Sequence, residues 1–90
     1  MNILLTGSEG FIGSNLKPYI EKNIDANIHC IDLKFGDDLQ TCVLPDNIDL
    51  VIHLAGLSGV RQSLNKPTEY WKQNVIVSQR IFDTYKDSRI

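Results

Sequence analysis

A glycine-rich turn near the amino terminus constrains the fold of this chain more than any other feature. Residues 7–13 read Gly-Ser-Glu-Gly-Phe-Ile-Gly, with glycine at every third position. The turn follows the apolar residues 3–6 and precedes residues 14–23, in which apolar side chains recur at helical spacing. A strand, a glycine turn and a helix in this order bring backbone N–H groups and the positive end of a helix dipole together. The pattern therefore predicts a binding site for the diphosphate of a dinucleotide.

The same turn excludes one large class of nucleotide-binding protein. A phosphate loop of the nucleoside-triphosphatase type needs Lys and then Ser or Thr after its last glycine. Ser14 and Asn15 stand at these two positions. The turn is therefore not a loop of that type.

Two further apolar runs predict a parallel sheet. Residues 27–32 and 50–55 are nearly continuous in apolar side chains, as in strands that are covered on both faces. Residues 67–86 begin with a proline at a helix start and continue at helical spacing. We therefore expect an α/β fold, a partial Rossmann fold with three α/β/α layers around a short parallel sheet. Residues 1–90 are expected to form a single truncated NAD(P)-binding domain.

Two details depart from this regular pattern. Pro18 removes a backbone donor from the first helix at a cost of about 3 kcal/mol, which predicts a kink or a shorter helix. The second detail is the short connection between the second and third predicted strands, over residues 33–49. Its length is enough for a crossover between parallel strands, but too short for a full helix, another strand and two loops.

Composition and charge exclude several other classes. Apolar residues make up 42% of the chain, which is ordinary for a globular protein, and no apolar run approaches the roughly 20 residues of a transmembrane helix. The net charge of −2, without a basic cluster, argues against nucleic acid and anionic membranes as partners. Cys30 and Cys42 are too far apart for a CxxC motif, and neither they nor His29 and His53 have metal-ligand spacing, so no metal is expected. No export signal is visible after Met1, so a cytoplasmic location is expected.

The second predicted strand ends in a carboxylate, Asp32. In dinucleotide-binding folds an acidic residue about 20 residues beyond the glycine turn accepts hydrogen bonds from the adenosine ribose and repels a 2′-phosphate. The spacing from Gly13 to Asp32 matches this pattern and favours NAD as the cofactor, although Lys34 nearby could accommodate the phosphate of NADP. The alternative interpretation is an aspartate that only serves a turn at the end of the strand.

Several motifs together give the chain a family likeness. They are Thr-Gly-x-x-Gly-Phe-Ile-Gly at residues 6–13, the aspartate after the second strand, Asp-Leu at residues 38–39 and His-Leu-Ala-Gly at residues 53–56. With these motifs the chain resembles the extended short-chain dehydrogenases/reductases, and among them the NAD-dependent epimerases and dehydratases of nucleotide sugars. The string Gly-Val-Arg-Gln-Ser-Leu at residues 59–64, followed by Pro67, Tyr70 and Asn74, looks most like UDP-glucuronate epimerases.

The resemblance implies roles for individual residues. The cofactor-binding positions that it implies are Gly7, Gly10, Phe11, Ile12 and Gly13 for the diphosphate, Asp32 for the adenosine ribose, Asp38 and Leu39 for the adenine, and Leu54, Ala55 and Gly56 for the ribose side of the cofactor. Arg61 and Ser63 resemble loop residues on the substrate side. Asn74 matches a helix asparagine that orders the catalytic lysine through water in the wider family, which implies an auxiliary catalytic role.

Asn74 is also unusual on the residues alone. It lies three residues after Trp71, on a stripe with Val75, Ser78 and Phe82 that we expect to be the buried face of the last helix. A buried amide must find partners or cost about 1–3 kcal/mol. The alternative role for Asn74 is a structural amide that ties down a neighbouring loop.

The chain lacks the side-chain pair that carries hydride chemistry in this family. The pair is Tyr-x-x-x-Lys, in which the lysine lowers the pKa of the tyrosine so that the tyrosine can act as a base. The residues four positions after the three tyrosines are Asn23, Asn74 and Arg89. We therefore expect the NAD-binding portion of an enzyme whose full-length form acts on a nucleotide sugar, inactive by itself. The alternatives are a non-enzymatic module that senses a dinucleotide or binds a partner, and an NADP-linked sugar reductase.

The resemblance also predicts an open sheet edge. In the family's strand order, further strands would follow on the open side of the third strand. Without them, the edge through Val51, Ile52 and Leu54 would be unpaired and able to pair with another chain, so we expect self-association. The alternative is that residues 58–64 fold over this edge.

Overall fold

Three parallel strands form one sheet in the order β2-β1-β3. The computed structural model describes residues 1–57 and 60–90, with side chains except those of Val60 and Arg61. The strands are β1 (Asn2–Thr6), β2 (Asn27–Ile31) and β3 (Leu50–His53). Their order and direction confirm the predicted parallel sheet.

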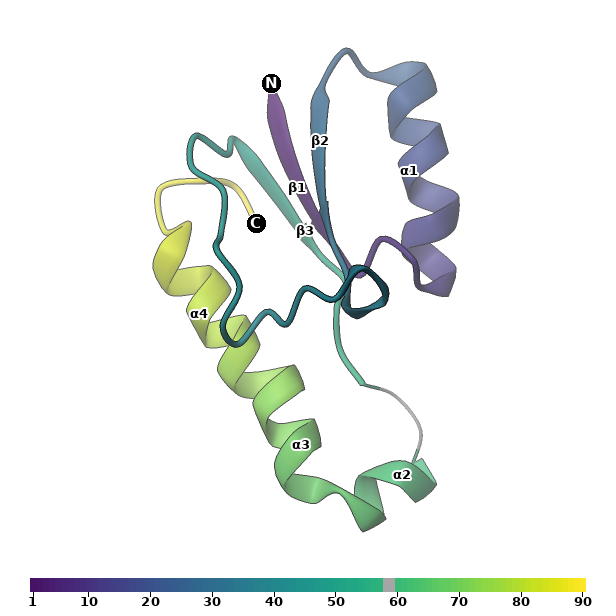
Figure 1. Ribbon diagram of the computed structural model, residues 1–90. Helices are drawn as coiled ribbons and strands as arrows, with labels where there is room; N and C mark the ends of the chain where they lie inside the picture. The colour runs from purple at the N-terminus through teal and green to yellow at the C-terminus, as the bar shows by residue number, and fades with distance from the viewer. Residues whose placement is uncertain (58–59) are drawn as a thin grey trace.

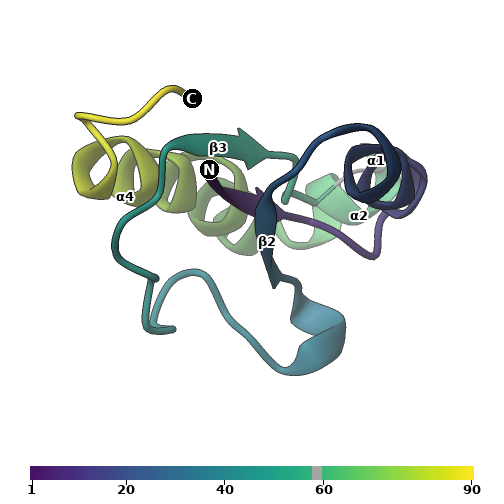
Figure 2. The same cartoon turned by 90° about the horizontal axis from the view of Figure 1, so that it is seen from above.

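Helices cover both faces of this sheet. Helix α1 (Phe11–Asn23) lies on one side, and a long helical segment lies on the other (Figures 1 and 2). The long segment consists of α3 (Pro67–Trp71), the π-helical turn η2 (Lys72–Ile76) and α4 (Val77–Thr84), and the short helix α2 (Val60–Asn65) precedes it. The predicted α/β/α layering is confirmed. None of the helices in the described ranges is long and apolar enough to cross a membrane.

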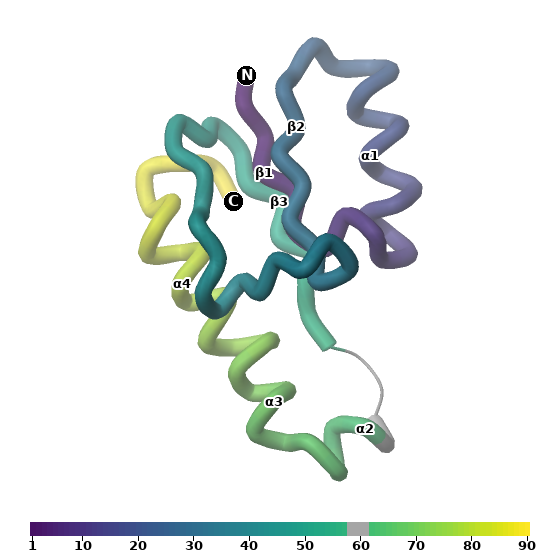
Figure 3. Tube along the Cα trace, in the orientation of Figure 1, coloured from purple at the N-terminus to yellow at the C-terminus, as the bar shows by residue number. Residues whose placement is uncertain are grey.

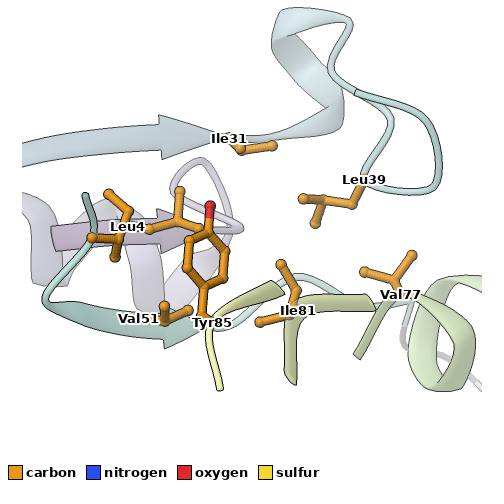
Figure 4. Packing of buried hydrophobic residues seen from close by; sticks show 8 residues of the cluster. Leu4, Ile31, Leu39, Val51, Val77, Ile81 and Tyr85 are labelled. Carbon is orange, nitrogen blue, oxygen red and sulfur yellow. The ribbon is translucent and has the colours of Figure 1, made fainter. Parts of the chain in front are cut away.

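The central strand β1 is apolar because both of its faces are covered. Residues 3–6 are at most 1% exposed. Leu4 packs with Val51 of β3 and Ile81 of α4 in the main core cluster (Figure 4). The neighbours of Leu4 point to the opposite face by the alternation of a strand, and on that side α1 contributes the buried Ile20. The core is thus built on both sides of one strand.

Helix α1 continues through Pro18, which corrects the expectation of a shorter helix. It ends at Asn23, where the apolar pattern ends. Proline removes the N–H group that would bind the carbonyl group of Ser14. Pro18 and Ser14 are both exposed, so water can satisfy that carbonyl group and the helix need not end.

The connection between β2 and β3, residues 32–49, contains neither a further strand nor an α-helix among its residues, all of which the structure describes. It begins with a 3-10 turn, η1 (Leu33–Phe35), and then runs irregularly beside α4 (Figure 3). The prediction from its length is therefore confirmed. This segment, the β2–β3 connection, returns the chain from the carboxyl edge of the sheet to the amino edge.

Side chains from the last helix and from the residues after it bind the β2–β3 connection. The guanidinium group of Arg80 donates to the carbonyl oxygens of Leu39 at 2.6 Å and Cys42 at 2.7 Å. Two hydroxyl groups donate to carbonyl oxygens further along the connection. The hydroxyl group of Tyr85 donates to the carbonyl oxygen of Pro45 at 2.8 Å, and the hydroxyl group of Ser88 donates to that of Ile48 at 2.5 Å. An irregular segment cannot satisfy its own carbonyl groups as a helix does, so these donors supply the missing bonds.

The long helical segment buries a different face from the one that the pattern predicted. Trp71, Val75 and Phe82 of the predicted face are 59%, 42% and 54% exposed. The buried residues recur every four positions: Gln73, Val77, Ile81 and Tyr85. The segment therefore carries two stripes, and the buried one includes Gln73 of the π-helical turn.

The outer edge of β3 is partly paired, which corrects the expectation for Val51 and Leu54. The N–H group of Val51 donates to the carbonyl oxygen of Arg89 at 2.7 Å, and the N–H group of Arg89 donates to that of Asp49 at 3.2 Å. The N–H group of Leu54 donates inward, to β1. Residue 89 therefore covers the start of the edge. The alternative cover, residues 58–64, includes two positions outside the described residues.

Replacing Arg80 tests whether the β2–β3 connection depends on its bonds. Arg80→Met keeps the aliphatic part of the side chain but removes both donors. Because a hydrogen bond to a charged group contributes about 1.5–3 kcal/mol, we expect the free energy of unfolding in urea to fall by about 2–4 kcal/mol. The control is Gln79→Met at the exposed neighbouring position, which should change it by less than about 0.5 kcal/mol. Equal effects of the two changes would contradict this role of Arg80.

Candidate functional site

The glycine-rich turn, the end of β2 and the segment after β3 meet at the carboxyl edge of the sheet. They line a cleft with a volume of about 220 Å³. The lining includes these residues of the predicted set: Gly7, Gly10, Asp32, Leu39, Leu54, Ala55 and Gly56. Open parallel sheets bind their ligands at this edge. The fold thus brings together motifs that are far apart in the sequence.

Gly7 and Gly13 are required by the packing of the chain itself. Gly7 has a φ of +71°, and a Cβ atom there would lie 2.7 Å from the backbone nitrogen of Ala55. A Cβ atom at Gly13 would collide with the carbonyl oxygen of Gly7 and lie 2.8 Å from the Cα atom of Ser8. Without side chains at these positions, β1, α1 and the segment after β3 approach one another at backbone contact.

Gly10 has space for a side chain and faces the cleft. Its φ of −77° is open to any residue, and a Cβ atom would meet only the carbonyl oxygen of Gly7, at 3.4 Å. The first hydrogen bond of α1 runs from the N–H group of Ser14 to Gly10. This leaves the N–H groups of residues 11–13, all within the described range, without a partner in their helix. The open position at Gly10 lies beside these donors, an arrangement that suits an anionic ligand.

The carboxylate of Asp32 is fixed at the end of β2 by two backbone donors. Its Oδ2 accepts from the N–H group of Glu9 and its Oδ1 from that of Lys34, both at 2.9 Å. The second bond caps η1, so the turn role that the sequence left open is present. Each carboxylate oxygen has a further lone pair, and Asp32 lines the cleft. Asp32 therefore serves the turn and still has acceptor capacity for a ligand.

A second acidic residue, Asp38, does not itself line the cleft but lies between two residues that do, Asp37 and Leu39. Its Oδ1 accepts from the N–H group of Gln40 at 2.9 Å, and the side-chain amide of Gln73 donates to the same oxygen at 3.5 Å. The neighbouring Leu39 is buried in the core and lines the cleft. An apolar surface next to an acceptor suits a flat, partly polar ring such as a nucleobase.

The cleft also includes residues that the sequence analysis did not select. They are Glu9, Leu33, Asp37, Leu57 and Gln73. Gln73 is the most informative, because this polar residue is only 7% exposed and belongs to the π-helical turn. Turns of this kind often occur at functional sites, but they have no signal in a single sequence. The sequence feature that points to Gln73 as a site residue is its position directly before Asn74.

The cleft wall, defined as residues 54–57, is fixed by two polar side chains. The hydroxyl oxygen of Thr6 accepts from the first two N–H groups of the wall, both at 3.1 Å. The side chain of Asn74 accepts from the N–H group of Leu57 at 2.7 Å and donates to its carbonyl oxygen at 2.9 Å. Asn74 therefore ties down a neighbouring loop, as the alternative interpretation had it. It is exposed rather than on the buried stripe, and its catalytic role stays a prediction.

Some predicted site residues lie outside the lining of the cleft. Phe11 and Ile12, in the first turn of α1, have side chains that are 87% and 61% exposed, so their backbone groups are the ones available to an anion. Ser63 lies half-buried in α2. The predicted substrate-side residue Arg61 has its side chain outside the described residues.

Comparison with known proteins places these features in a wider group. Residues 3–90 match the family described as "NAD dependent epimerase/dehydratase family". The chain is 33% identical to the UDP-glucose 4-epimerase of Pasteurella multocida, over 100% of the chain and 34% of the relative. It is 32% identical to an uncharacterized protein of Methanocaldococcus jannaschii, over 91% of the chain and 35% of the relative. The chain thus spans about a third of the length of these relatives.

A solved structure shares the fold. The UDP-N-acetylglucosamine 4-epimerase from Methanobrevibacter ruminantium, in complex with UDP-N-acetylmuramic acid, matches with a TM-score of 0.76 and 24% identity, over 97% of this chain and 34% of that one. The alignment with the Pasteurella protein runs over 116 positions, more than the 90 residues of this chain. Some aligned positions of that relative therefore have no counterpart here.

The two kinds of glycine can be separated by experiment. Gly13→Ala places a methyl group against the backbone, so we expect a loss of unfolding free energy of about 3 kcal/mol or more. Gly10→Ala meets only an ordinary contact and a weaker helix cap, and should cost about 1 kcal/mol or less. Urea unfolding of both variants, followed by circular dichroism, measures the difference. A Gly10→Ala variant as unstable as Gly13→Ala would contradict the open space at Gly10.

Proposed function

The chain belongs to the NAD-dependent epimerase/dehydratase family, and we propose that its cleft binds NAD as the cofactor-binding portion of a nucleotide-sugar epimerase or dehydratase. The observation that carries this proposal is that Gly10, with its open position, and Asp32, with its carboxylate, line one cleft, and that the free N–H groups of α1 follow directly after Gly10. Similarity to UDP-glucose 4-epimerases supports the nucleotide-sugar class.

The residues of the cleft fit the parts of a dinucleotide. The amino end of α1 would bind the diphosphate beside Gly10, because its N–H groups carry partial positive charge. Asp32 would accept hydrogen bonds from the hydroxyl groups of the adenosine ribose with its remaining lone pairs. The side chain of Leu39 would contact the adenine, and Ala55 and Gly56 would line the second ribose. When bound, NAD supplies the capacity to accept a hydride from a sugar carbon and to return it.

The charges of the cleft support NAD over NADP. Glu9, Asp32 and Asp37 contribute three carboxylates to the lining, and Lys34 contributes one ammonium group. A 2′-phosphate near Asp32 would add negative charge where negative charge already dominates. The excess of negative charge therefore favours an adenosine ribose without a 2′-phosphate, as in NAD.

Calorimetric titration with both nucleotides tests the proposal. We expect NAD to bind more tightly than NADP by about tenfold, which corresponds to about 1.4 kcal/mol of charge repulsion. Asp32→Asn should reduce this ratio, whereas Asp25→Asn, the same change at an exposed position away from the cleft, should leave it unaltered. Gly10→Ala should weaken both nucleotides, since its methyl group would occupy the space in front of the α1 donors. Equal or tighter binding of NADP would remove Asp32 from the ribose role.

We further propose that the chain by itself has no epimerase or dehydrogenase activity. Of the family's catalytic positions it contains only Asn74, and no tyrosine is followed by lysine four residues later. The purified chain, supplied with NAD and UDP-glucose, should therefore leave the sugar nucleotide unchanged when the mixture is analysed by chromatography. Turnover would show that another group serves as the base.

Two alternatives and one expectation remain beside this proposal. A non-enzymatic module would bind the dinucleotide equally well, and an NADP-linked sugar reductase would require the opposite nucleotide preference. Self-association through the edge of β3 stays a prediction, and the pairing of Val51 with Arg89 leaves less of that edge available for it.

A further inference from the structure

A chain of hydrogen bonds passes through His53, the last residue of β3. The Nδ1 atom of His53 lies 2.6 Å from the hydroxyl oxygen of Thr6 in β1, and its Nε2 atom lies 3.1 Å from that of Ser78 in α4. The hydroxyl group of Ser78 donates to the carbonyl oxygen of Asn74 at 2.9 Å. Thr6 and Asn74, at the two ends of this series of hydrogen bonds, are the residues that fix the cleft wall.

The donors and acceptors in this series of hydrogen bonds are compatible with one arrangement of protons. The hydroxyl oxygen of Thr6 accepts two N–H groups of the cleft wall, so both lone pairs are used and its proton must go to Nδ1 of His53. Ser78 gives its proton to Asn74 and must accept from Nε2 of His53. The imidazole is therefore neutral, with its proton on Nε2.

We propose that His53 is a positioning residue for the cofactor: as a neutral imidazole it orients the hydroxyl group of Thr6, which in turn orients the N–H groups of Leu54 and Ala55. The proposal rests on the proposed function, since NAD is the ligand that the cleft wall would contact. The side chain of Asn74 binds the far end of the wall, and its backbone carbonyl oxygen accepts from Ser78. One imidazole thus lies between the two residues that bind the ends of the cleft wall.

Protonation of His53 would disrupt this arrangement. With a proton on Nδ1, two donor groups would face each other across the 2.6 Å between His53 and Thr6. The hydroxyl group of Thr6 would have to turn, and a lone pair that now binds the cleft wall would accept from the imidazolium. The wall would lose one hydrogen bond. We expect NAD affinity to fall by about fivefold, the factor that corresponds to one ordinary hydrogen bond.

The surroundings of His53 agree with a neutral ring. Burial lowers the pKa of His53 below its usual value of 6.5. The polar groups that face the ring are the hydroxyl groups of Thr6 on β1 and Ser78 on α4, and no charged side chain of the described residues contributes to the shift. The unfolded chain therefore takes up a proton at a higher pH than the folded chain does. The stability that the neutral ring contributes is complete above pH 6.5 and is lost as the pH falls through the lowered pKa.

The test measures the NAD affinity of the whole chain by calorimetry between about pH 5 and pH 8, a window in which histidine is the side chain that titrates. Wild-type affinity should fall as the pH drops below 6.5 and His53 takes up a proton, by up to about fivefold, again the factor for one hydrogen bond. His53→Gln retains a donor and an acceptor but does not titrate, so its profile should be flat. The matched control is His29→Gln on the exposed surface of β2, which should reproduce the wild-type profile. A profile that His53→Gln shares with the wild type would overturn the proposal.

Nitrogen-15 NMR of the wild-type chain gives a second readout that needs neither ligand nor variant. His53 should show the Nε2–H tautomer, and hydrogen exchange at the amides of Leu54 and Ala55, corrected for its intrinsic pH dependence, should accelerate as His53 titrates. An Nδ1–H tautomer would overturn the proposal even if His53→Gln does not fold. If NAD binds at no pH while the tautomer and the exchange are as expected, the proposed function fails and the positioning of the wall by His53 stands.

Discussion

The close backbone approach between the turn after β1 and the segment after β3 is the constraint on which the cleft depends. Gly7 lies against Leu54 and Ala55 with no room for a Cβ atom. The N–H groups of Leu54 and Ala55 at this approach both donate to the hydroxyl oxygen of the adjacent Thr6. Steric fit and hydrogen-bond satisfaction therefore come from two consecutive residues. The hydrogen bonds that link Thr6 to His53, and His53 to Ser78 of the long helix, begin at this same residue, Thr6.

Features that depend on local chemistry could be predicted from the sequence. Three apolar runs and one glycine turn are sufficient for a parallel sheet, and parallel strands end at a common edge, which places the cleft. Asp32 could be identified because its position at the end of β2 follows from spacing alone. The irregular β2–β3 connection followed from simple length, since so short a segment cannot contain a helix, another strand and the loops that would join them.

Features that depend on packing between distant segments could not be predicted. The long helix carries two apolar stripes, and periodicity cannot select between Trp71 and Val77 as core residues. Gln73 lines the cleft from a π-helical turn, which a single sequence does not reveal. His53 contacts partners that lie 47 and 25 residues away, separations at which no periodic pattern acts. The role of His53 beside the cleft therefore follows from contacts that exist only in the folded chain.

The bonds from the end of the long helix to the β2–β3 connection also affect the order in which the protein takes shape on the ribosome. The donors are Arg80, Tyr85 and Ser88, and their acceptors lie within residues 39–48. Synthesis proceeds from the amino terminus, so these acceptor carbonyl groups emerge well before their partners and stay hydrated until residues 80–88 follow. The part of the cleft that includes Leu39, although encoded in the first half of this sequence, is therefore completed only after residues 80–88 have emerged. A nascent chain that has not yet reached residue 80 has the glycine-rich turn but lacks the side chains that bind the carbonyl groups of Leu39 and Cys42.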